Sequence, residues 1–380
     1  MRQCLTLILC VVLGACAQLP PPTQPLAGVF HDEFFAAPSQ PVDVRQVFAL
    51  SDSMRAYLQT ELASNFKGPR QSLIDAVAQG QLKLEYDSVT TRNAAESFEA
   101  KSGNCLSLVV MTAAFAKALD LEVQYNSAVF GDQWSRDGNV YFLNGHVNLT
   151  LGKRFIDPRT LYDTAEYMTI DFLPGPEIRG LRSTQVSEGT VVAMFMNNRA
   201  AEALVRGRLD DAYWLVREAI RQDASFWAAY NTLGVLYLRR GRPELAEPVF
   251  RHVLGFDANN TRALANLALT LGRSGREAEA AAIDRQLASI EGDAPFHFFH
   301  AGLAAMEAGD FNAARRLFAK EVRRAPEYHE FHFWLGIAEL RLGDIDTARS
   351  EFELALENST TRHDHDLYAA KLSRLSSYRR

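Results

Sequence analysis

Five glycines recur at intervals of 34 residues in the second half of the chain, and this period constrains the fold more than any other feature. They are Gly207, Gly241, Gly275, Gly309 and Gly343. Each is followed five residues later by an alanine, and seven residues before each stands alanine or glycine. A fixed period of this length predicts a solenoid of stacked units, in which each unit packs only on its neighbours.

Each unit is expected to hold two helices that cross at a small residue, with the glycine at the turn between them. The small residues at the crossing are Ala200, Gly234, Ala268, Gly302 and Gly336. The residues that would fill the space between units are Val216, Phe250, Asp284, Phe318 and Phe352. This pattern resembles the tetratricopeptide repeat. The resemblance implies an all-α solenoid of five repeats over residues 191–362 and a capping helix over 363–380, with a degenerate middle repeat because Asp284 stands at an apolar position.

In that family the first helix of each repeat lines a concave groove. The resemblance assigns apolar groove positions in the last two repeats to Phe296, Phe299, Leu303, Met306, Phe333, Ile337 and Leu340. Such a groove either receives a peptide or partner helix, or it packs on the rest of the chain. The sequence leaves both alternatives open.

Paired histidines three residues apart, or two in the last pair, raise the question of a metal site in the same region. The pairs are His297 with His300, His329 with His332, and His363 with His365. Metal sites need further ligands at a defined spacing, and no Cys, Asp or Glu cluster completes one here. We therefore interpret them as surface histidines and expect neither a metal nor another cofactor.

The N-terminus has the pattern of an export signal. A positive charge at Arg2 precedes the apolar stretch Leu5–Leu13, which is too short to span a bilayer. The sequence Leu13-Gly14-Ala15-Cys16 resembles the bacterial lipoprotein signal, which implies a signal peptide over 1–15, lipidation of Cys16 and a membrane anchor made of acyl chains. An ordinary secretory signal is the alternative. Residues 16–40 would form a Pro-rich tether, and the absence of Asp after Cys16 implies the outer membrane, facing the periplasm.

Charge and cysteine content narrow the function further. The net charge is −6 without a basic concentration, so we exclude nucleic acid as the partner. Cys4 and Cys10 would leave with the signal and Cys16 would carry lipid, so Cys105 would be the only thiol of the mature protein. A lone cysteine in an exported protein is a candidate reactive thiol.

Residues 41–190 predict a domain of the α+β class. Helical patterns cover residues 42–64, a short stretch after Pro69, 91–100 and 106–119, and the last is apolar almost all round. Alternating patterns then predict strands at 121–125, 140–143 and 147–151, with a polar loop over 131–139. Gly152-Lys153 predicts a two-residue hairpin turn.

These elements bring together the parts of a catalytic triad. Cys105 begins the apolar helix, where the helix dipole and free N–H groups stabilise a thiolate. In the predicted hairpin Asn148 pairs with Asp157, which makes His146 and Asp157 diagonal neighbours on one face. Cys105, His146 and Asp157 would then act as nucleophile, base and orienting carboxylate. The alternative is that the three residues have structural roles only, as a buried cysteine, a histidine in a strand and an aspartate in a turn.

The same segments resemble the transglutaminase-like cysteine enzyme superfamily, which has a papain/transglutaminase-like fold. The matching segments are Ser102–Leu108, Ala116–Val123, Asn144–Val147 and Phe155–Pro158. The resemblance implies acyl-thioester chemistry on a peptide or amide, as in a thiol peptidase or amidase. The candidates for an oxyanion donor or for the cleft are the Cys105 backbone N–H, Gln124, Trp134 and Asn148. The competing hypothesis is a non-catalytic envelope scaffold that binds proteins through its repeats.

Overall fold

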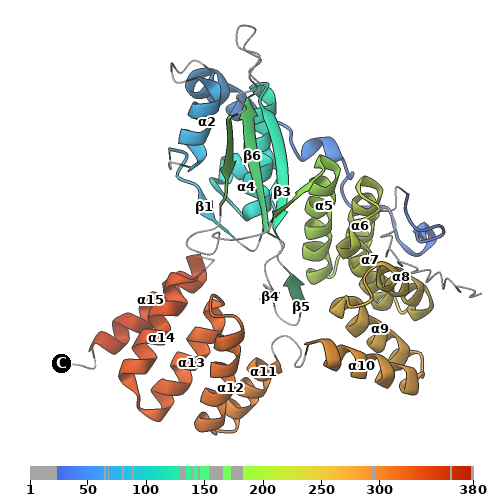
Figure 1. The fold of residues 1–380 in the computed structure, drawn as a ribbon, viewed down its shortest axis with the longest axis vertical. Coiled ribbons are helices and arrows are strands. Elements are labelled where there is room, and N and C mark those ends of the chain that lie inside the picture. The colour runs from blue at the N-terminus through green and yellow to red at the C-terminus, as the bar shows by residue number, and fades with distance from the viewer. Residues whose placement is uncertain are drawn as a thin grey trace, which may run out of the picture.

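The structure is a computed structural model. It describes residues 24–63, 66, 68–78, 81–87, 90–128, 134–137, 140–143, 146–153, 166–172, 183–291, 297–359 and 362–377. An α/β part comes first and is followed by an arc of helices (Figure 1). Among these described residues, no helix combines the length and apolar character that a membrane crossing requires.

The α/β part is built around one buried helix, α4 (Cys105–Ala118), which is buried continuously from Cys105 to Ala116. Its almost entirely apolar sequence explains this, since such a helix is stable only when it is covered on every side. The helices and short turns that accompany it are η1 (Asp32–Phe34), η2 (Val44–Gln46), α1 (Asp52–Tyr57), the π-helix η3 (Leu58–Leu62), α2 (Pro69–Ala78) and α3 (Ala94–Ala100). The single helix expected over 42–64 is therefore interrupted, because Ser51 caps a new start at α1.

A four-stranded antiparallel sheet covers one side of α4. Its strands, in spatial order, are β7 (Glu166–Ile170), β6 (His146–Lys153), β3 (Glu122–Ala128) and β8 (Ser183–Val186). Val147, Leu149 and Leu151 of β6 are buried in the core that contains α4, while the alternate residues form a polar face. Two smaller ladders are β1 (Glu85–Tyr86) with β2 (Ser102–Gly103), and β4 (Trp134–Asp137) with β5 (Val140–Leu143).

The hairpin turn predicted at Gly152 and Lys153 is wrong. Both residues lie inside β6, where Gly152 faces Tyr167 and Lys153 faces Glu166. The glycine is needed for a different reason: a Cβ at Gly152 would lie 2.5 Å from Cε1 of Tyr167. The strand runs through both residues of the predicted turn, and its residues from Leu149 to Lys153 pair with β7. Asp157 itself lies outside the described residues.

Eleven helices follow in the described residues from 188 onward, as the period of 34 residues predicts. They are α5 (Glu188–Val205), α6 (Leu209–Gln222), α7 (Trp227–Arg239), α8 (Pro243–Phe256), α9 (Thr261–Arg273), α10 (Glu277–Glu291), α11 (His297–Glu307), α12 (Phe311–Arg324), α13 (His329–Leu342), α14 (Ile345–Glu357) and α15 (Arg362–Ser377). The recurring glycines lie at the turns with φ between 70° and 86°, a conformation that favours glycine. Position 302 requires glycine because a Cβ there would lie 2.5 Å from Cε1 of the Phe318 ring.

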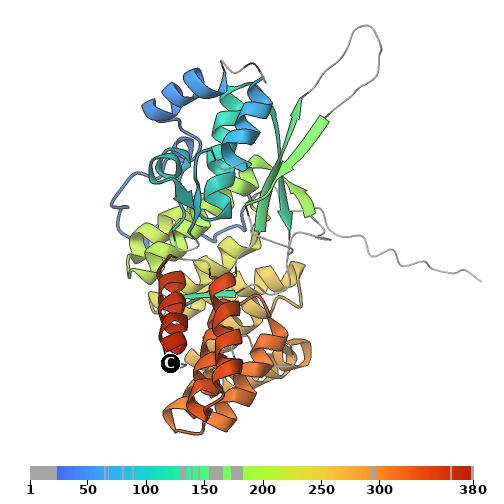
Figure 2. The ribbon, with the colours of Figure 1, turned by 90° about the vertical axis from the view of Figure 1, so that its left-hand side faces the viewer.

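The first helix of the solenoid also belongs to the α/β part. Glu188 of α5 accepts hydrogen bonds from Lys117 of α4 and Tyr125 of β3. Glu202, on the same helix, accepts from the backbone N–H of Thr91. Buried apolar residues of both parts, from Val29 to Ala280 along the chain, consequently form one continuous hydrophobic core. Figure 2 shows the sheet and the first helices of the solenoid in contact.

The solenoid is interrupted between α10 and α11. Helices α8 and α9, like α12 and α13, pack on one another, whereas α10 and α11 do not pack in this way in the described part of the chain. The last repeats have hydrophobic cores of their own, centred on Phe318 and Phe352. The repeat before the break is also the one that carries Asp284, where the other repeats carry Val or Phe.

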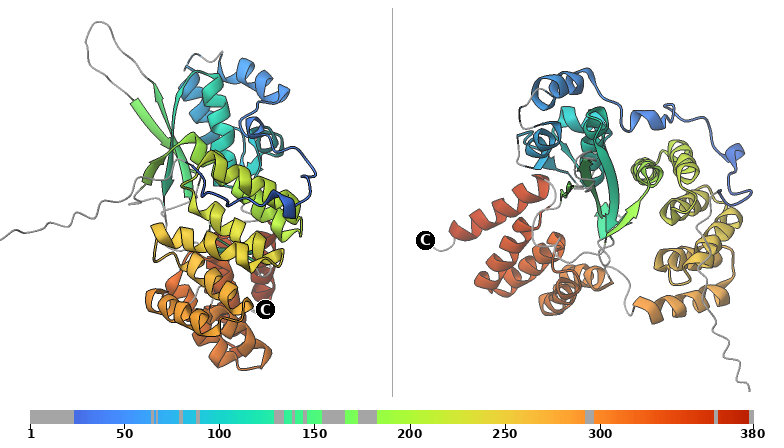
Figure 3. Two further views of the ribbon diagram at one scale, coloured as in Figure 1. Left: turned by 90° about the vertical axis from the view of Figure 1, so that its right-hand side faces the viewer. Right: turned by 45° about the horizontal axis from the view of Figure 1, so that its top comes forward.

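Residues 24–39, expected to be part of an extended Pro-rich tether, form a strap that packs along α6 and α7. Phe35 stacks on Tyr213 with 3.9 Å between ring centroids, and Tyr237 donates a hydrogen bond to the carbonyl of Val29. Trp214 donates to the carbonyl of Ala36. The strap runs along the outside of the solenoid, on the side away from the sheet (Figure 3).

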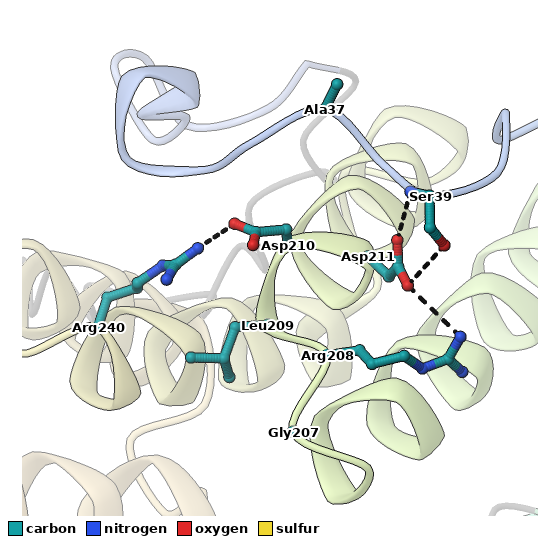
Figure 4. A pocket seen from close by; sticks show the side chains of 8 residues that line it. All are labelled: Ala37, Ser39, Gly207, Arg208, Leu209, Asp210, Asp211 and Arg240. Carbon is teal, nitrogen blue, oxygen red and sulfur yellow. Dashed lines mark hydrogen bonds and ion pairs between the residues drawn. The ribbon is translucent and has the colours of Figure 1, made fainter.

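Two aspartates at the start of α6 hold the end of the strap. Asp211 accepts hydrogen bonds from the backbone and side chain of Ser39 and also pairs with Arg208, while Asp210 pairs with Arg240 (Figure 4). The hydrogen bond from the backbone N–H of Ser39 holds the pKa of Asp211 below its usual range. The strap thus ties the first repeats to the chain that enters the α/β part.

Replacing Phe318 by alanine is expected to destabilise the last repeats by about 3–5 kcal/mol, the usual cost of removing a buried ring. Calorimetry should then show the transition of α11–α14 at lower temperature, with the rate of Cys105 alkylation unchanged. Phe250→Ala is the matched control, because its ring packs on Gly234 in the same way but belongs to the core that contains α4. If Phe318→Ala moved the whole unfolding curve, the two blocks would not be separate.

Candidate functional site

Cys105 is held at the first position of α4 by a well-defined cap. The side chain of Asn104 accepts hydrogen bonds from the backbone N–H of Ser107 at 2.9 Å and from its hydroxyl at 2.8 Å. Gly103 precedes the cap, where a Cβ would lie 2.6 Å from the Cβ of Ser107. Backbone N–H groups of the first helical turn have no partner within the helix, so Cys105 lies at a site that stabilises negative charge.

A second layer of hydrogen bonds fixes this cap. The amide of Asn104 donates to the hydroxyl of Thr91, and the hydroxyl of Ser107 accepts from the backbone N–H of Arg92. Asn93 and Glu96 form a capping box at the start of α3. The segment from Thr91 to Cys105 therefore folds as a local unit that sets the position of the thiol.

His146 lies at the start of β6 and is 2% exposed. Its Nε2 is 2.7 Å from Oδ2 of Asp171, which follows directly after β7. The imidazole also lies close enough to the Cys105 side chain for the two groups to interact. The structure therefore brings Cys105, His146 and Asp171 together as thiol, imidazole and carboxylate.

Asp171 is itself held in place. Its Oδ2 accepts a hydrogen bond at 3.0 Å from the amide of Asn148, whose carbonyl oxygen accepts from Asn126. The register of β6 and β7 places Asp171 one position beyond the pair of Leu149 with Ile170, on the polar face of the sheet. Asn148, expected in the cleft, orients the carboxylate instead.

These partners decide the charge of His146. Burial disfavours the imidazolium and would lower the pKa, but hydrogen bonds with Asp171 and Cys105, together with their negative charges, raise the pKa of His146 to about 9. The imidazole thus keeps a second proton at neutral pH. A cation beside the sulfur favours the thiolate, which is the nucleophilic form.

A tyrosine that the sequence analysis did not identify completes the surroundings of the thiol. The hydroxyl of Tyr86 lies 3.3 Å from Sγ of Cys105. Tyr86 is placed there by the parallel ladder of β1 with β2, in which it faces Gly103. Neither the two-residue ladder nor β7 gives a strong periodic signal, and for this reason Tyr86 and Asp171 were missed.

Of the other predicted oxyanion candidates, Gln124 lies away from the thiol. Gln124 lies opposite Thr150, four residues along β3 from the position that faces His146, or about 13 Å at the rise of a strand. Its amide donates to Glu122. Trp134, expected in a polar loop, begins β4 opposite Leu143. Cys16, the predicted lipidation site, lies outside the described residues.

The predicted groove residues separate into two groups. Phe299 is fully buried and packs on Phe318 and Phe331, so its assignment to an open groove is wrong. The others that the structure describes are partly buried against the two C-terminal cores, and they are Leu303, Met306, Phe333, Ile337 and Leu340. Phe333 also stacks on Tyr368 of α15. Phe296 lies outside the described residues.

Two of the histidines expected on the surface have structural roles. His332 is 3% exposed, and its two ring nitrogens lie 2.6 Å from Glu351 and from the carbonyl of Pro326. Burial alone would lower the pKa of His332, but these two acceptors raise it. His329 pairs with the hydroxyl of Tyr368 and so connects α13 with the C-terminal helix α15.

Asp171→Asn should remove the negative charge that raises the pKa of His146. Once this pKa falls below 7, the protonated fraction of His146, and with it the rate of Cys105 alkylation at pH 7, should fall by about tenfold for each further pKa unit. The wild-type free energy of unfolding should fall as pH rises from about 6.5 to about 9, because the folded protein alone keeps the His146 proton in that range. Below it, both states are protonated and the contribution is complete.

The measurement is chemical denaturation at several pH values together with iodoacetamide kinetics. The variant should flatten this part of the pH curve. Asp87→Asn is the control, because Asp87 pairs with Arg92 near the site without touching the imidazole. Equal effects of the two substitutions would show that Asp171 acts only through general stability.

Comparisons with known proteins identify the second half of the chain. The tetratricopeptide repeat family model matches residues 197–261 and 299–362, on either side of the interruption. No curated protein matches the chain.

Solved structures that resemble it include PilF of Pseudomonas aeruginosa, with 20% identity, coverage of 49% of this chain and 85% of that chain, and a TM-score of 0.29. YrrB, a tetratricopeptide-repeat protein with an unusual peptide-binding site, has 18% identity and a TM-score of 0.26, and the match covers 47% of this chain and 92% of that chain. MamA of Desulfovibrio magneticus RS-1 has 20% identity, 45% and 96% coverage and a TM-score of 0.26. The helices that follow the α/β part carry tetratricopeptide repeats, a module that binds proteins and peptides.

Proposed function

We propose that the protein is a thiol enzyme that cleaves or transfers peptide or amide acyl groups, with Cys105 as nucleophile. The observation that carries this proposal is the buried His146, whose Nε2 binds Asp171 while its ring contacts the sulfur at the start of α4. The resemblance to transglutaminase-like enzymes supports the same chemistry. Asp171 takes the orienting role that the sequence pattern assigns to Asp157.

The mechanism follows from the charges of the site. The Cys105 thiolate attacks the carbonyl carbon, and the carbonyl electron pair moves onto oxygen. His146 then gives a proton to the departing amine as the carbon–nitrogen bond breaks, leaving a thioester and a neutral imidazole. Water, or a second amine, loses a proton to His146 and attacks the thioester, and the thiolate is restored. Asp171 keeps the ring oriented and stabilises its charge throughout.

The repeats and the N-terminus suggest where this chemistry takes place. The sequence up to Cys16 supports a lipid-anchored protein of the bacterial envelope, at the outer membrane and facing the periplasm. The repeats would recruit the substrate polypeptide or a protein partner. Their attachment through α5 to the core that contains α4 supports a shared role, since a bound polypeptide would be held on the same body as the thiol.

A non-catalytic scaffold is the second candidate. It is favoured by the low exposure of Cys105, which is 9% exposed and lies against Tyr86 and His146. In this alternative the three side chains are a structural remnant, and the repeats carry the whole function.

Labelling of Cys105 separates the two candidates. The wild-type protein should react with iodoacetamide at pH 6–7 about a hundredfold faster than a free thiol, because the cationic His146 favours the thiolate. His146→Ala should lose this advantage, and Cys105→Ala should abolish labelling while keeping the melting temperature. A wild-type rate equal to that of a free thiol would refute the enzyme and favour the scaffold. Capture of acylated proteins from envelope extracts, with Cys105→Ser as the control, would then identify the substrate.

A further inference from the structure

The side chain of Tyr86, which is not part of the triad, lies beside the Cys105 sulfur. Its hydroxyl lies 3.3 Å from Sγ, a normal separation for a hydrogen bond to sulfur. Tyr86 is half-buried, and it comes from a segment 19 residues before the cysteine. The contact is therefore made by tertiary structure and not by proximity along the chain.

The backbone on both sides of Tyr86 is tied to the segment that leads into Cys105. The N–H of Glu85 donates to the carbonyl of Lys101 at 2.8 Å, and the N–H of Asp87 donates to the carbonyl of Gly103 at 3.1 Å. The side chain of Asp87 also pairs with Arg92 at 2.8 Å. These bonds surround Tyr86, so the position of the hydroxyl is set by the same local unit that positions the thiol.

The form of the sulfur decides which atom is the donor. The proposed mechanism starts from the thiolate, which has no proton and accepts hydrogen bonds only. In that form the Tyr86 hydroxyl is the donor, 3.3 Å from the sulfur. When the sulfur attacks a carbonyl, its negative charge moves to an oxygen bonded to the same carbon. A donor already directed at the sulfur is then adjacent to the new charge, where a preorganised donor has its largest effect on rate.

We propose that Tyr86 is a catalytic residue that donates its hydrogen bond first to the Cys105 thiolate and then to the oxyanion formed on the acyl group. This rests on the proposed function of Cys105. It assigns to Tyr86 the role for which Gln124 and Trp134 were the sequence candidates. The second donor to the oxyanion is the backbone N–H of Cys105, at the start of α4.

Two reagents distinguish this role from simple support of the fold. Iodoacetamide alkylates the thiolate by displacement at a saturated carbon and forms no oxyanion. A 4-nitrophenyl ester acylates the thiolate through an oxyanion and releases a coloured product. Tyr86→Phe keeps the ring and removes only the hydroxyl. In the full chain it should slow alkylation by a few fold and acylation by about a hundredfold, as expected for loss of one oxyanion donor.

Tyr125→Phe is the matched control, because it removes a buried hydroxyl of the same α/β part that binds Glu188 far from the sulfur. It should leave the ratio of the two rates unchanged. If Tyr86→Phe slowed both reactions equally, or neither, the catalytic role of Tyr86 would be refuted while the reactivity of Cys105 in the wild-type protein still supported the enzyme. If the wild-type thiol reacted with neither reagent faster than a free thiol, both proposals would fail.

Discussion

The structure depends on the burial of α4. A helix that is apolar on all sides needs a cover in every direction, and the chain provides it from three sources: the sheet, the short helices that precede it, and α5. The third source has the largest consequence. Because α5 is also the first helix of the repeats, the solenoid cannot separate from the α/β part without exposing the core. The thiol at the start of α4 thus lies in a body that includes the first repeats.

The sequence predicted two of the three side chains that meet at the start of α4, Cys105 and His146, but not Asp171. Cys105 could be found because its helix follows from local pattern, and His146 because it precedes a strand with clear alternation. The orienting carboxylate depends on which segment pairs with β6. Gly152 was read as a turn, whereas it is a strand glycine that makes room for the ring of Tyr167. The pairing of β6 with β7 places Asp171 beside His146. This pairing joins residues that are separated along the chain, so the local spacing of residues does not predict it.

The repeats were predicted from their period, and their departures from it were harder to foresee. Proline near the N-terminus predicted an extended tether, but the aromatic residues of 24–39 pack on tyrosines of α6 and α7. Phe299 was assigned to the groove by position and is buried between neighbouring rings. In both cases the pattern gave the correct backbone, and tertiary contacts decided which side chains remain exposed.

The interruption after α10 changes how a partner would meet the thiol. A continuous solenoid presents its ligand at a fixed distance and angle. In the described chain, α10 and α11 form no packed interface that would set this geometry. A polypeptide held by α11–α15 would then meet Cys105 with a probability given by its effective concentration. The length of the connection between the blocks determines that concentration. Such delivery tolerates substrates of different length and shape. For the proposed thiol enzyme, selectivity would then come from what the repeats capture more than from the shape of a cleft.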